Sequence, residues 1–398
     1  MLFERWARIL AVTGIIAEFN PLHTGHKRLI DEAKASGKAV AAVLSGNFVQ
    51  RGECAALEKG TRAKCALMCG VDTVAELPVL WSMSTAQNFA LGAVCQLHRL
   101  GTDEIIFGSE CGDTYKLKTA ADILGSDEFA AFLAEKVNGA LTFAVARKEA
   151  AKALGADASV LDSPNDNLAV EYIIAAKKLG LPINFKCIKR EGAPHDSKCV
   201  SGDFVSASYI RDELSKGNLA FAERFMPPVL HGVIKAEDIA DNRKLETAVL
   251  AVLRTKTASD FAMLPDIGEG LENRLEFAVR AATNLEELQG QLKSKRYTLA
   301  RVRRLILSAF LGFENTFFMK PPPYVRLLGA SKTGLEALAE NATDTVTKPS
   351  QIKALGAEAE KVFETECRAT DIFTLSMSVP LEAGLEYKRK FLKTEELK

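Results

Sequence analysis

The sequence predicts an α/β protein in which a Rossmann-like parallel sheet is followed by an all-helical domain. Short apolar runs alternate with segments of helical periodicity through the first half of the chain. This alternation is typical of right-handed βαβ units and of a parallel sheet covered on both faces. The 398 residues also exceed what one hydrophobic core usually organises, so two domains are expected.

The predicted strands are short apolar runs that contain β-branched residues. The first begins near residue 11 and breaks at Asn20-Pro21, after which helical spacing resumes from Gly25. Sheets of this kind bind ligands where the carboxyl ends of strands meet the N-termini of helices. The later strands are expected at 39–45, 71–77, 104–108 and 183–188, with helices that begin at Thr61, Ser84 and Ser206 or cover 117–137, 145–154 and 166–179.

The domain boundary is expected at Pro227-Pro228, because two consecutive prolines can continue neither a helix nor a sheet. The first domain then comprises residues 1–226 and the second comprises residues 227–398. Periodicity in the second domain is almost wholly helical, at 243–254, 271–292 and 298–311, and it is interrupted at Pro321-Pro322-Pro323.

The composition excludes several classes of protein. Apolar residues make up 47% of the chain and charged residues 26%, which is typical of a globular protein. Lys plus Arg equals Asp plus Glu at 51 each, which excludes a uniformly basic surface for nucleic acid but allows a local basic patch. No apolar run is long enough to span a bilayer and no signal peptide pattern is present, so a cytoplasmic protein is expected. The eight cysteines lack CxxC spacing and predict small buried side chains rather than a metal site.

Two histidines mark the first strand–helix turn. His23 and His26 lie at i, i+3 around a helix start, directly after an apolar strand and Asn20-Pro21. Free N–H groups at a helix N-terminus favour an anion, and Gly25 removes a side chain where a nucleotide would approach. The histidines could donate to oxygens whose charge grows as pyrophosphate leaves. The pattern predicts a triphosphate site with His23 and His26 as catalytic residues, and two ordinary surface histidines at a helix cap are the alternative.

A second candidate phosphate element is the segment Ser206-Ala207-Ser208-Tyr209-Ile210-Arg211. Hydroxyl groups at a helix start accept backbone N–H bonds or bind phosphate, and Arg211 reaches the same side. Taken alone, the segment is more often an ordinary serine-rich helix cap. Together with the preceding His-x-Gly-His pattern, it resembles the Ser-Ser-Thr-x-x-Arg element of the HxGH nucleotidyltransferase superfamily. Ser208 and Arg211 are therefore included in the predicted ATP site.

A closer resemblance extends along nearly the whole chain. Six segments carry it in the same order along the chain: GIIAEFNPLHTGH (14–26), SGNFVQRGE (45–53), GVDTVAELP (70–78), FGSE (107–110), SPNDN (163–167) and KPPPYVRLLG (320–329). They resemble the tRNA(Met) cytidine acetate ligase family. This resemblance implies a nucleotidyltransferase-like domain with an added helical domain. It also implies adenylation of acetate by ATP and transfer of the acetyl group to N4 of the wobble cytidine of elongator tRNA(Met), giving N4-acetylcytidine.

The resemblance also implies an ATP site, and Mg²⁺ is expected to arrive with the triphosphate. The chain departs from the family at Pro-Asn-Asp-Asn-Leu (164–168), where Pro-Asn-Asn-Ile-Leu is expected, but Asn165 is retained. The implied ATP-binding residues are Gly14, Ile15, Ile16, Ala17, Glu18, Phe19, Asn20, Pro21, Leu22, His23, Thr24, Gly25, His26, Lys27, Gly108, Asn165 and Arg190.

Residues 293–304, KSKRYTLARVRR, form a strongly basic segment in the second domain, with six basic residues and no acidic residue. Arg301 and Arg304 share one side of a predicted helix, and Val302 and Ile306 fall towards the opposite side. A helix that packs by its apolar side would display a cationic ridge suited to a tRNA backbone. A solvated charged face is the alternative. The predicted tRNA contacts are Lys293, Lys295, Arg296, Arg301 and Arg304.

Two other functions are consistent with these patterns, and a fold alone does not exclude them. A small-molecule adenylyltransferase would pass AMP to a phosphorylated precursor and would not need the basic segment. A non-catalytic RNA-binding protein would hold ATP as a structural ligand and would keep its RNA affinity without His23. The sequence leaves open the oligomeric state, the acyl pocket and the group that takes the proton from the cytidine amine.

Overall fold

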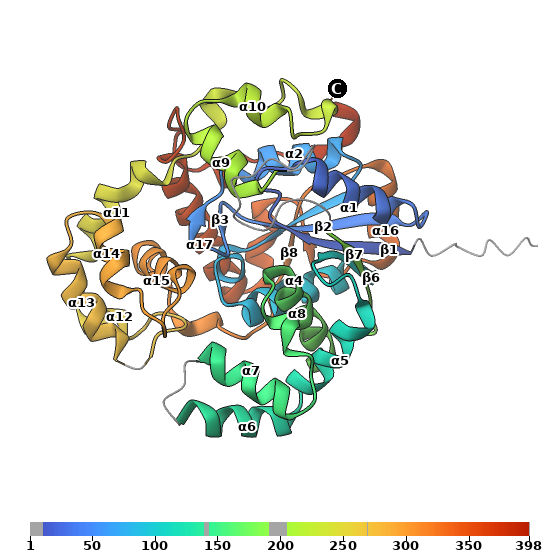
Figure 1. The fold of residues 1–398 in the computed structure, drawn as a ribbon. Helices are drawn as coiled ribbons and strands as arrows, with labels where there is room; N and C mark the ends of the chain where they lie inside the picture. The colour runs from blue at the N-terminus through green and yellow to red at the C-terminus, as the bar shows by residue number, and fades with distance from the viewer. Residues whose placement is uncertain (1–10, 139–142, 191–204, 269, 398) are drawn as a thin grey trace, which may run out of the picture.

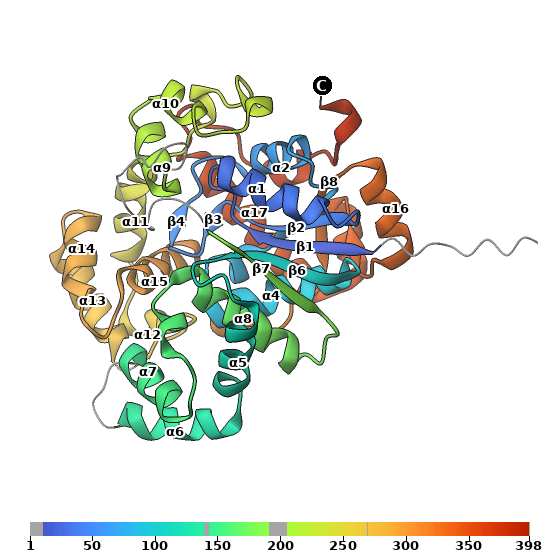
Figure 2. The ribbon, with the colours of Figure 1, turned by 45° about the vertical axis from the view of Figure 1, so that its right-hand side comes forward.

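The computed structural model describes residues 11–138, 143–190, 205–268 and 270–397. One mostly parallel sheet forms the centre of the protein, and helices cover both of its faces (Figure 1). Helices α11 to α15 gather beyond the carboxyl ends of the parallel strands, as a second view confirms (Figure 2). The mixed α/β fold with a helical second part, predicted from the sequence, is confirmed.

The order of the strands places β1 (Val12–Ala17) at the topological switch point of the sheet. The chain moves outward from β1 through β2 (Ala39–Ser45) to β5 (Thr73–Leu77). It then returns to the other side of β1 with β6 (Thr102–Ser109) and β7 (Asn184–Lys189). These neighbours all pair in parallel. The crevice at the carboxyl ends of β1 and β6 is therefore where a ligand is expected.

Each buried strand divides its side chains between two cores. Odd-numbered residues of β2 from Ala39 pack in the core that contains α4 and α8, and even-numbered residues from Val40 pack in the core that contains α1 and α2. This alternation follows from the two-residue repeat of a strand. The first core includes α4 (Ala86–Arg99), α5 (Thr114–Leu124) and α8 (Pro164–Lys178), and the second includes α1 (Thr24–Lys34), α2 (Lys59–Met68), α9 (Ala207–Ser215) and α10 (Leu219–Glu223).

A third core belongs to the helical lobe, which we define as α11 to α15. Its helices are α11 (Glu246–Leu253), α12 (Ala258–Phe261), α13 (Leu271–Ala281), α14 (Leu285–Leu292) and α15 (Leu299–Leu311). The other strands are the hairpin β3 (Phe48–Val49) and β4 (Glu53–Cys54), together with β8 (Val325–Ala330), β9 (Thr345–Val346) and β10 (Leu392–Lys393). The other α-helices are α3 (Val79–Ser82), α6 (Asp127–Asn138), α7 (Phe143–Ala153), α16 (Lys332–Asn341), α17 (Ala357–Thr374) and α18 (Leu385–Lys388).

Three predicted boundaries differ from the structure for local reasons. Helix α2 begins at Lys59 rather than at Thr61, because the Glu58 carboxylate accepts the N–H of Gly60 at 2.6 Å and caps the helix. The predicted helix 271–292 is divided by Asn284, whose side chain caps α14. The predicted helix 117–137 is likewise divided, into α5 and α6.

The prediction that residues 227–398 are all helical is wrong in one respect. Strand β8 pairs antiparallel with β5, and β9 and β10 pair with β8, so the C-terminal part of the chain completes the central sheet. Val325–Ala330 is buried throughout, so it has no alternation of apolar and polar residues to distinguish a strand from a buried helix. The triple proline before it also suggested an interruption rather than the start of a strand.

A buried cluster of charges joins this returning segment to the first part of the chain. The Lys59 ammonium is fully buried and contacts the carboxylates of Glu366 at 2.7 Å and Glu386 at 2.8 Å, and also that of Glu76. Arg326 of β8 contacts Glu76 at 3.3 Å. A buried charge left without its partner is costly, so Lys59 fixes the C-terminal helices against the sheet.

We expect Lys59→Met to lower the free energy of unfolding by about 3–5 kcal/mol, because it leaves buried carboxylates without their shared cation. Urea denaturation followed by circular dichroism measures this change. Lys388→Met is the matched control, since Lys388 is exposed, and it should leave the denaturation midpoint unchanged. A Lys59→Met protein that unfolds at the wild-type urea concentration would contradict the structural role of the cluster.

Candidate active site

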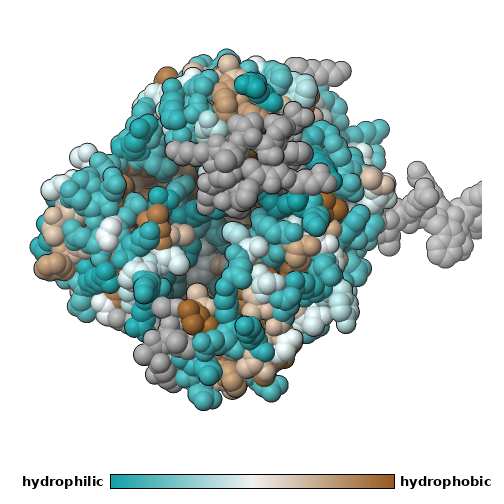
Figure 3. All heavy atoms as spheres, viewed as in Figure 1, coloured by the Kyte–Doolittle hydropathy of each residue, from teal (hydrophilic) through white to brown (hydrophobic). Residues whose placement is uncertain are grey.

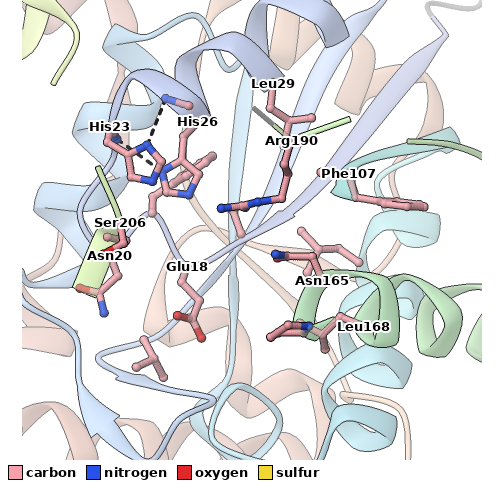
Figure 4. Close-up of a pocket in the computed structure, with 18 of the residues that line it drawn as sticks. Glu18, Asn20, His23, His26, Leu29, Phe107, Asn165, Leu168, Arg190 and Ser206 are labelled. Atoms are coloured by element: carbon pink, nitrogen blue, oxygen red, sulfur yellow. Dashed lines mark hydrogen bonds between the residues drawn. The ribbon is translucent and has the colours of Figure 1, made fainter. Parts of the chain in front are cut away.

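A pocket of about 290 Å³ opens at the carboxyl ends of β1 and β6. It lies at the topological switch point beside β1, and the surface is hollowed between α15 and α8 in the view of Figure 3. Figure 4 shows residues from several elements pointing into the same space. The lining includes Ile16, Ala17, Glu18, Phe19, Asn20, His23, Thr24, Gly25, His26, Gly108, Asn165, Arg190 and Arg211, and, beyond the predicted residues, Arg28, Leu29, Gln50, Arg51, Phe89, Phe107, Leu168, Tyr172 and Ser206.

Both predicted histidines face the pocket from the start of α1. His23 is the N-cap residue, and its Nδ1 accepts the N–H of Gly25 at 3.0 Å. The Nδ1 of His26 accepts the N–H of His23 at 3.4 Å, and the two rings stack with centroids 3.8 Å apart (Figure 4). A neutral imidazole whose Nδ1 accepts carries its proton on Nε2. Each ring is thus arranged as an N–H donor beside the N-terminus of a helix, which suits a polyanion.

His26 is held in its neutral form. Its ring is half-buried, and this loss of water lowers its pKa well below the ordinary value; the positive charges of His23 and Arg190 act in the same direction. A hydrogen bond with the backbone of Pro21 has a smaller, opposite effect. A triphosphate would bring negative charge to this site and stabilise the protonated ring. Binding of a polyanion is therefore expected to raise the pKa of His26.

The second predicted phosphate element also reaches the pocket, with one change of residue. Ser206 lines the pocket and caps α9, whereas Ser208 lies outside the lining and contacts Ser206 through their hydroxyl groups at 3.1 Å. Arg211 lines the pocket and donates from Nη1 to the carbonyl of Asn20 at 3.0 Å. Arg211 therefore joins α9 to the strand–helix turn that carries the histidines.

The other end of the pocket is formed by residues after β6 and at the start of α8. Gly108 lies under Arg190, whose Cγ would be 3.3 Å from a Cβ at position 108, so a glycine allows this close approach. The Nδ2 of Asn165 donates to Glu110 at 2.5 Å, and the same carboxylate accepts the N–H of Asp166 at 3.2 Å. Glu110 thereby orients the Asn165 amide and leaves its oxygen and one N–H for a ligand.

Asp166 accounts for one of the two departures from the family pattern at residues 164–168. Its carboxylate is buried and accepts the Ser109 hydroxyl at 2.5 Å and the N–H groups of Glu110 and Cys111 at 3.0 Å each. An asparagine has only one acceptor oxygen and could not accept all three donors. Asp166 therefore fixes the loop after β6 against the start of α8, and Asn165 keeps its place in the pocket.

Several residues implied in ATP binding lie outside the pocket lining. Gly14 is packed against Leu97 and Thr102, whose side chains would lie 2.8 Å from a Cβ at that position. Ile15 and Leu22 are buried in the core on the α1 face, and Lys27 pairs with Asp31 on the surface of α1. The residues outside the lining are Gly14, Ile15, Pro21, Leu22, Lys27 and Ser208.

Some lining residues had no distinctive sequence signal. Phe89 of α4 and Tyr172 of α8 are buried side chains whose spacing predicts only the apolar side of a helix. Both nevertheless line the pocket. Arg28 and Leu29, one turn into α1, also line it. Their contribution depends on how the helices pack on the sheet, which local periodicity does not contain.

The basic segment 293–304 divides into two parts. Arg301 and Arg304 contact the Asp266 carboxylate at 3.3 and 3.8 Å, and Arg304 also donates to the carbonyl of Gln50 at 3.2 Å. Arg303 pairs with Glu53. Arg303 and Arg304 therefore attach α15 to the loop of residues 49–53, whereas Arg301 attaches it to Asp266. The exposed part of the predicted ridge consists of Lys293, Lys295 and Arg296.

Comparison with known proteins agrees with this fold and site. The model of the HIGH nucleotidyl transferase family matches residues 10–386. The crystal structure of Thermotoga maritima TmcAL (apo, form I) matches with a TM-score of 0.89 and 30% identity, over 96% of this chain and 100% of that chain. The structure of the same protein bound with alpha-thio ATP gives a TM-score of 0.87 at the same identity and coverage. The chain thus has the fold of a HIGH nucleotidyl transferase and belongs to that family.

Sequence relatives place the chain in one particular family within this class of nucleotidyl transferases. The tRNA(Met) cytidine acetate ligase of Thermoanaerobacter sp. (strain X514) is 35% identical, over 96% of this chain and 100% of the relative. The protein of the same name from Caldanaerobacter subterraneus subsp. tengcongensis is 37% identical, over 91% and 94%. The chain belongs to the tRNA(Met) cytidine acetate ligase family. The resemblance predicted from six sequence segments is confirmed.

We expect ATP binding to be coupled to proton uptake by His26. Because the pKa of free His26 lies well below 6.5 and a bound triphosphate raises it, ATP affinity should increase as pH falls from about 7.5 to 6, by less than tenfold per pH unit. Calorimetric titration in two buffers of different ionisation enthalpy measures the protons taken up. His26→Gln keeps an N–H donor but does not titrate in this range, and should reduce the uptake; equal uptake in both proteins would place the titrating group elsewhere.

Proposed function

We propose that this protein is an ATP-dependent ligase that joins acetate to N4 of the wobble cytidine of elongator tRNA(Met). The observation that carries the proposal is the pair of stacked histidines at the N-terminus of α1, which present N–H donors to the pocket in a chain of this family. A related protein of the same fold binds alpha-thio ATP, which supports ATP as the nucleotide. The names of the relatives support acetate and tRNA(Met) as the other substrates.

In the first step, the acetate carboxylate attacks the α-phosphorus of ATP, acetyl-adenylate forms and pyrophosphate leaves. His23, His26 and the N–H groups at the start of α1 stabilise the charge that grows on the departing pyrophosphate. Arg190 lies beside them and adds a fixed positive charge. At the other end, Asn165 and the open backbone at Gly108 hold the adenosine.

In the second step, N4 of cytidine attacks the acetyl carbonyl and AMP leaves. This amine is a weak nucleophile because its lone pair is delocalised into the ring, so the reaction needs an activated acyl donor and close positioning. The base has to be unstacked from the anticodon loop to enter the pocket. Mg²⁺ enters as part of the nucleotide substrate. Across the described ranges, no group of three or more His, Cys, Asp or Glu side chains is arranged to hold a metal ion.

We place the tRNA on the helical lobe of the second domain, residues 227–398, with first contacts at Lys293, Lys295 and Arg296. These side chains are exposed just before α15. Helix α15 contacts the loop of residues 49–53, which lines the pocket, so RNA held there would bring its anticodon loop close to the nucleotide. Arg304 acts indirectly in this arrangement, because it holds the loop, and Arg301 pairs with Asp266 beside it.

We place this reaction in the cytoplasm. The seven cysteines that the structure describes are free thiols, which suits a reducing compartment. In the part of the chain that is described, no helix is both long and apolar enough to cross a bilayer.

The proposal predicts that radioactive acetate labels tRNA(Met) in the presence of ATP. His26→Ala should lower the rate of labelling by about 100-fold or more, since it removes a donor to the departing pyrophosphate. His98→Ala, an exposed histidine outside the pocket lining, is the matched control and should label at the wild-type rate. AMP and pyrophosphate formed without labelled RNA would indicate an adenylyltransferase with another acceptor. Tight tRNA binding without either product would indicate a non-catalytic RNA-binding protein.

The placement of the tRNA on the helical lobe predicts a loss of tRNA affinity when Lys293, Lys295 and Arg296 are all replaced by Ala. Each phosphate contact contributes about 0.9 to the slope of log affinity against log salt for a duplex, so the slope should become shallower by up to about 3. Filter binding over a range of salt concentrations measures this slope, and acetate-dependent ATP–pyrophosphate exchange should be unchanged. Lys388→Ala/Lys390→Ala is the control with a similar loss of charge, and a similar effect in that variant would contradict the assignment.

A further inference from the structure

Two acidic side chains, Glu18 and Glu53, belong to the pocket lining. Glu53 pairs with Arg303 and is therefore neutralised. Glu18 follows directly after β1, and Figure 4 shows its side chain inside the pocket, with the carboxylate pointing away from the two histidine rings. Within the described residues, its carboxylate accepts the N–H of Gln50 at 3.0 Å and makes no ion pair.

A carboxylate is out of place in a site for a triphosphate, because like charges repel. Apart from Glu53, the other charged groups around the pocket are suited to hold negative charge. They are the two imidazole N–H donors and the cationic side chains of Arg28, Arg51, Lys189, Arg190 and Arg211. Glu18 has the opposite property, since an ionised carboxylate only accepts hydrogen bonds and protons. The resemblance implies Glu18 among the ATP-binding residues, but the charge of its side chain does not suit a triphosphate, so we assign the carboxylate a different role in the same pocket.

The second step of the proposed reaction supplies that reason. When N4 of cytidine attacks the acetyl carbonyl, the nitrogen becomes positively charged and its proton becomes acidic. The products form only when this proton is removed, and a positioned carboxylate is a suitable acceptor. The histidines cannot readily do this, because their Nδ1 atoms already accept backbone N–H groups and their Nε2 atoms carry protons.

The position of Glu18 also fits the direction from which an RNA would arrive. Gln50 donates its N–H to Glu18 and accepts from Arg304 of α15 through its carbonyl at 3.2 Å. Gly52 of the same loop lies directly on α15, and a Cβ at this position would be 2.5 Å from the backbone nitrogen of Arg304. Glu18 is therefore on the side of the pocket that the loop connects to the helical lobe, whereas Asn165 and Gly108 form the other side.

We propose that Glu18 is the catalytic proton acceptor for acetyl transfer to cytidine. The N4–C bond forms as the bond between the acetyl carbon and the AMP oxygen breaks, and the N4 proton passes to the Glu18 carboxylate while AMP leaves with the electron pair. The assignment rests on the proposed function. It predicts a residue that is needed for the second step and not for the first, which distinguishes Glu18 from His26.

The test compares the two steps in Glu18→Gln. Acetate-dependent exchange of pyrophosphate into ATP should stay within about threefold of wild type, whereas single-turnover transfer to tRNA(Met) should fall by about 10²- to 10⁴-fold. Chemically prepared acetyl-adenylate, which bypasses the first step, should not rescue the transfer. Glu336→Gln, on the exposed side of α16, is the matched control and should resemble wild type in both assays.

The possible results separate this inference from the proposed function. Exchange and transfer that fall together in Glu18→Gln, with an unchanged thermal midpoint, would overturn the inference and place Glu18 in nucleotide binding. Transfer at the wild-type rate in Glu18→Gln would also overturn it. A wild-type protein that neither exchanges pyrophosphate with acetate nor labels tRNA would overturn the proposed function itself. If Glu18→Gln lowers the thermal midpoint, Glu18→Asp is tested in its place. The inference predicts that Glu18→Asp exchanges pyrophosphate at the wild-type rate and transfers the acetyl group more slowly.

Discussion

Two buried cations on one side of α2 hold the fold and the site together. Arg62 is 1% exposed, and its guanidinium donates to the carbonyls of Glu18 and Ser45, at 2.7 and 2.9 Å, and to that of Gly46. These carbonyls belong to the carboxyl ends of β1 and β2. Burial lowers the pKa of Arg62 to about 10, so it stays charged at neutral pH. Arg62 thus holds the end of β1, which is followed by Glu18, next to the end of β2, which leads to the loop of residues 49–53.

Lys59, one turn earlier on the same helix, extends this constraint to the rest of the chain. A buried ammonium has to be paired, and two of its carboxylates, Glu366 and Glu386, belong to the C-terminal part. The chain therefore returns to the sheet after the helical lobe, through β8 and α17. The lobe is inserted into one α/β unit rather than added at its end, and its outward position at the carboxyl ends of the strands brings α15 to the mouth of the pocket.

The limits of prediction from sequence follow from the range of the interactions. The strand, turn and helix around His23 and His26 are specified by neighbouring residues, so the sequence predicts this part of the pocket, and both histidines line it. Phe89 and Tyr172 reach the pocket through helix packing, which local sequence does not show. The pairing of β8 was missed because its partners lie some 250 residues away in the sequence, as in the contact of Arg326 with Glu76. The sequence could show the charge of residues 293–304, but it could not show that Asp266 and Glu53 neutralise half of that segment.

The loop of residues 49–53 connects the two steps of the proposed reaction physically. Successive peptide groups at Gln50 contact Glu18 on one side and Arg304 on the other, and Gly52, with φ of +73°, lets the loop lie on α15. Two hydrogen bonds at Gln50 thus connect the carboxylate proposed as proton acceptor to the helix of the lobe proposed to hold the RNA, so the two proposed roles depend on the same short segment.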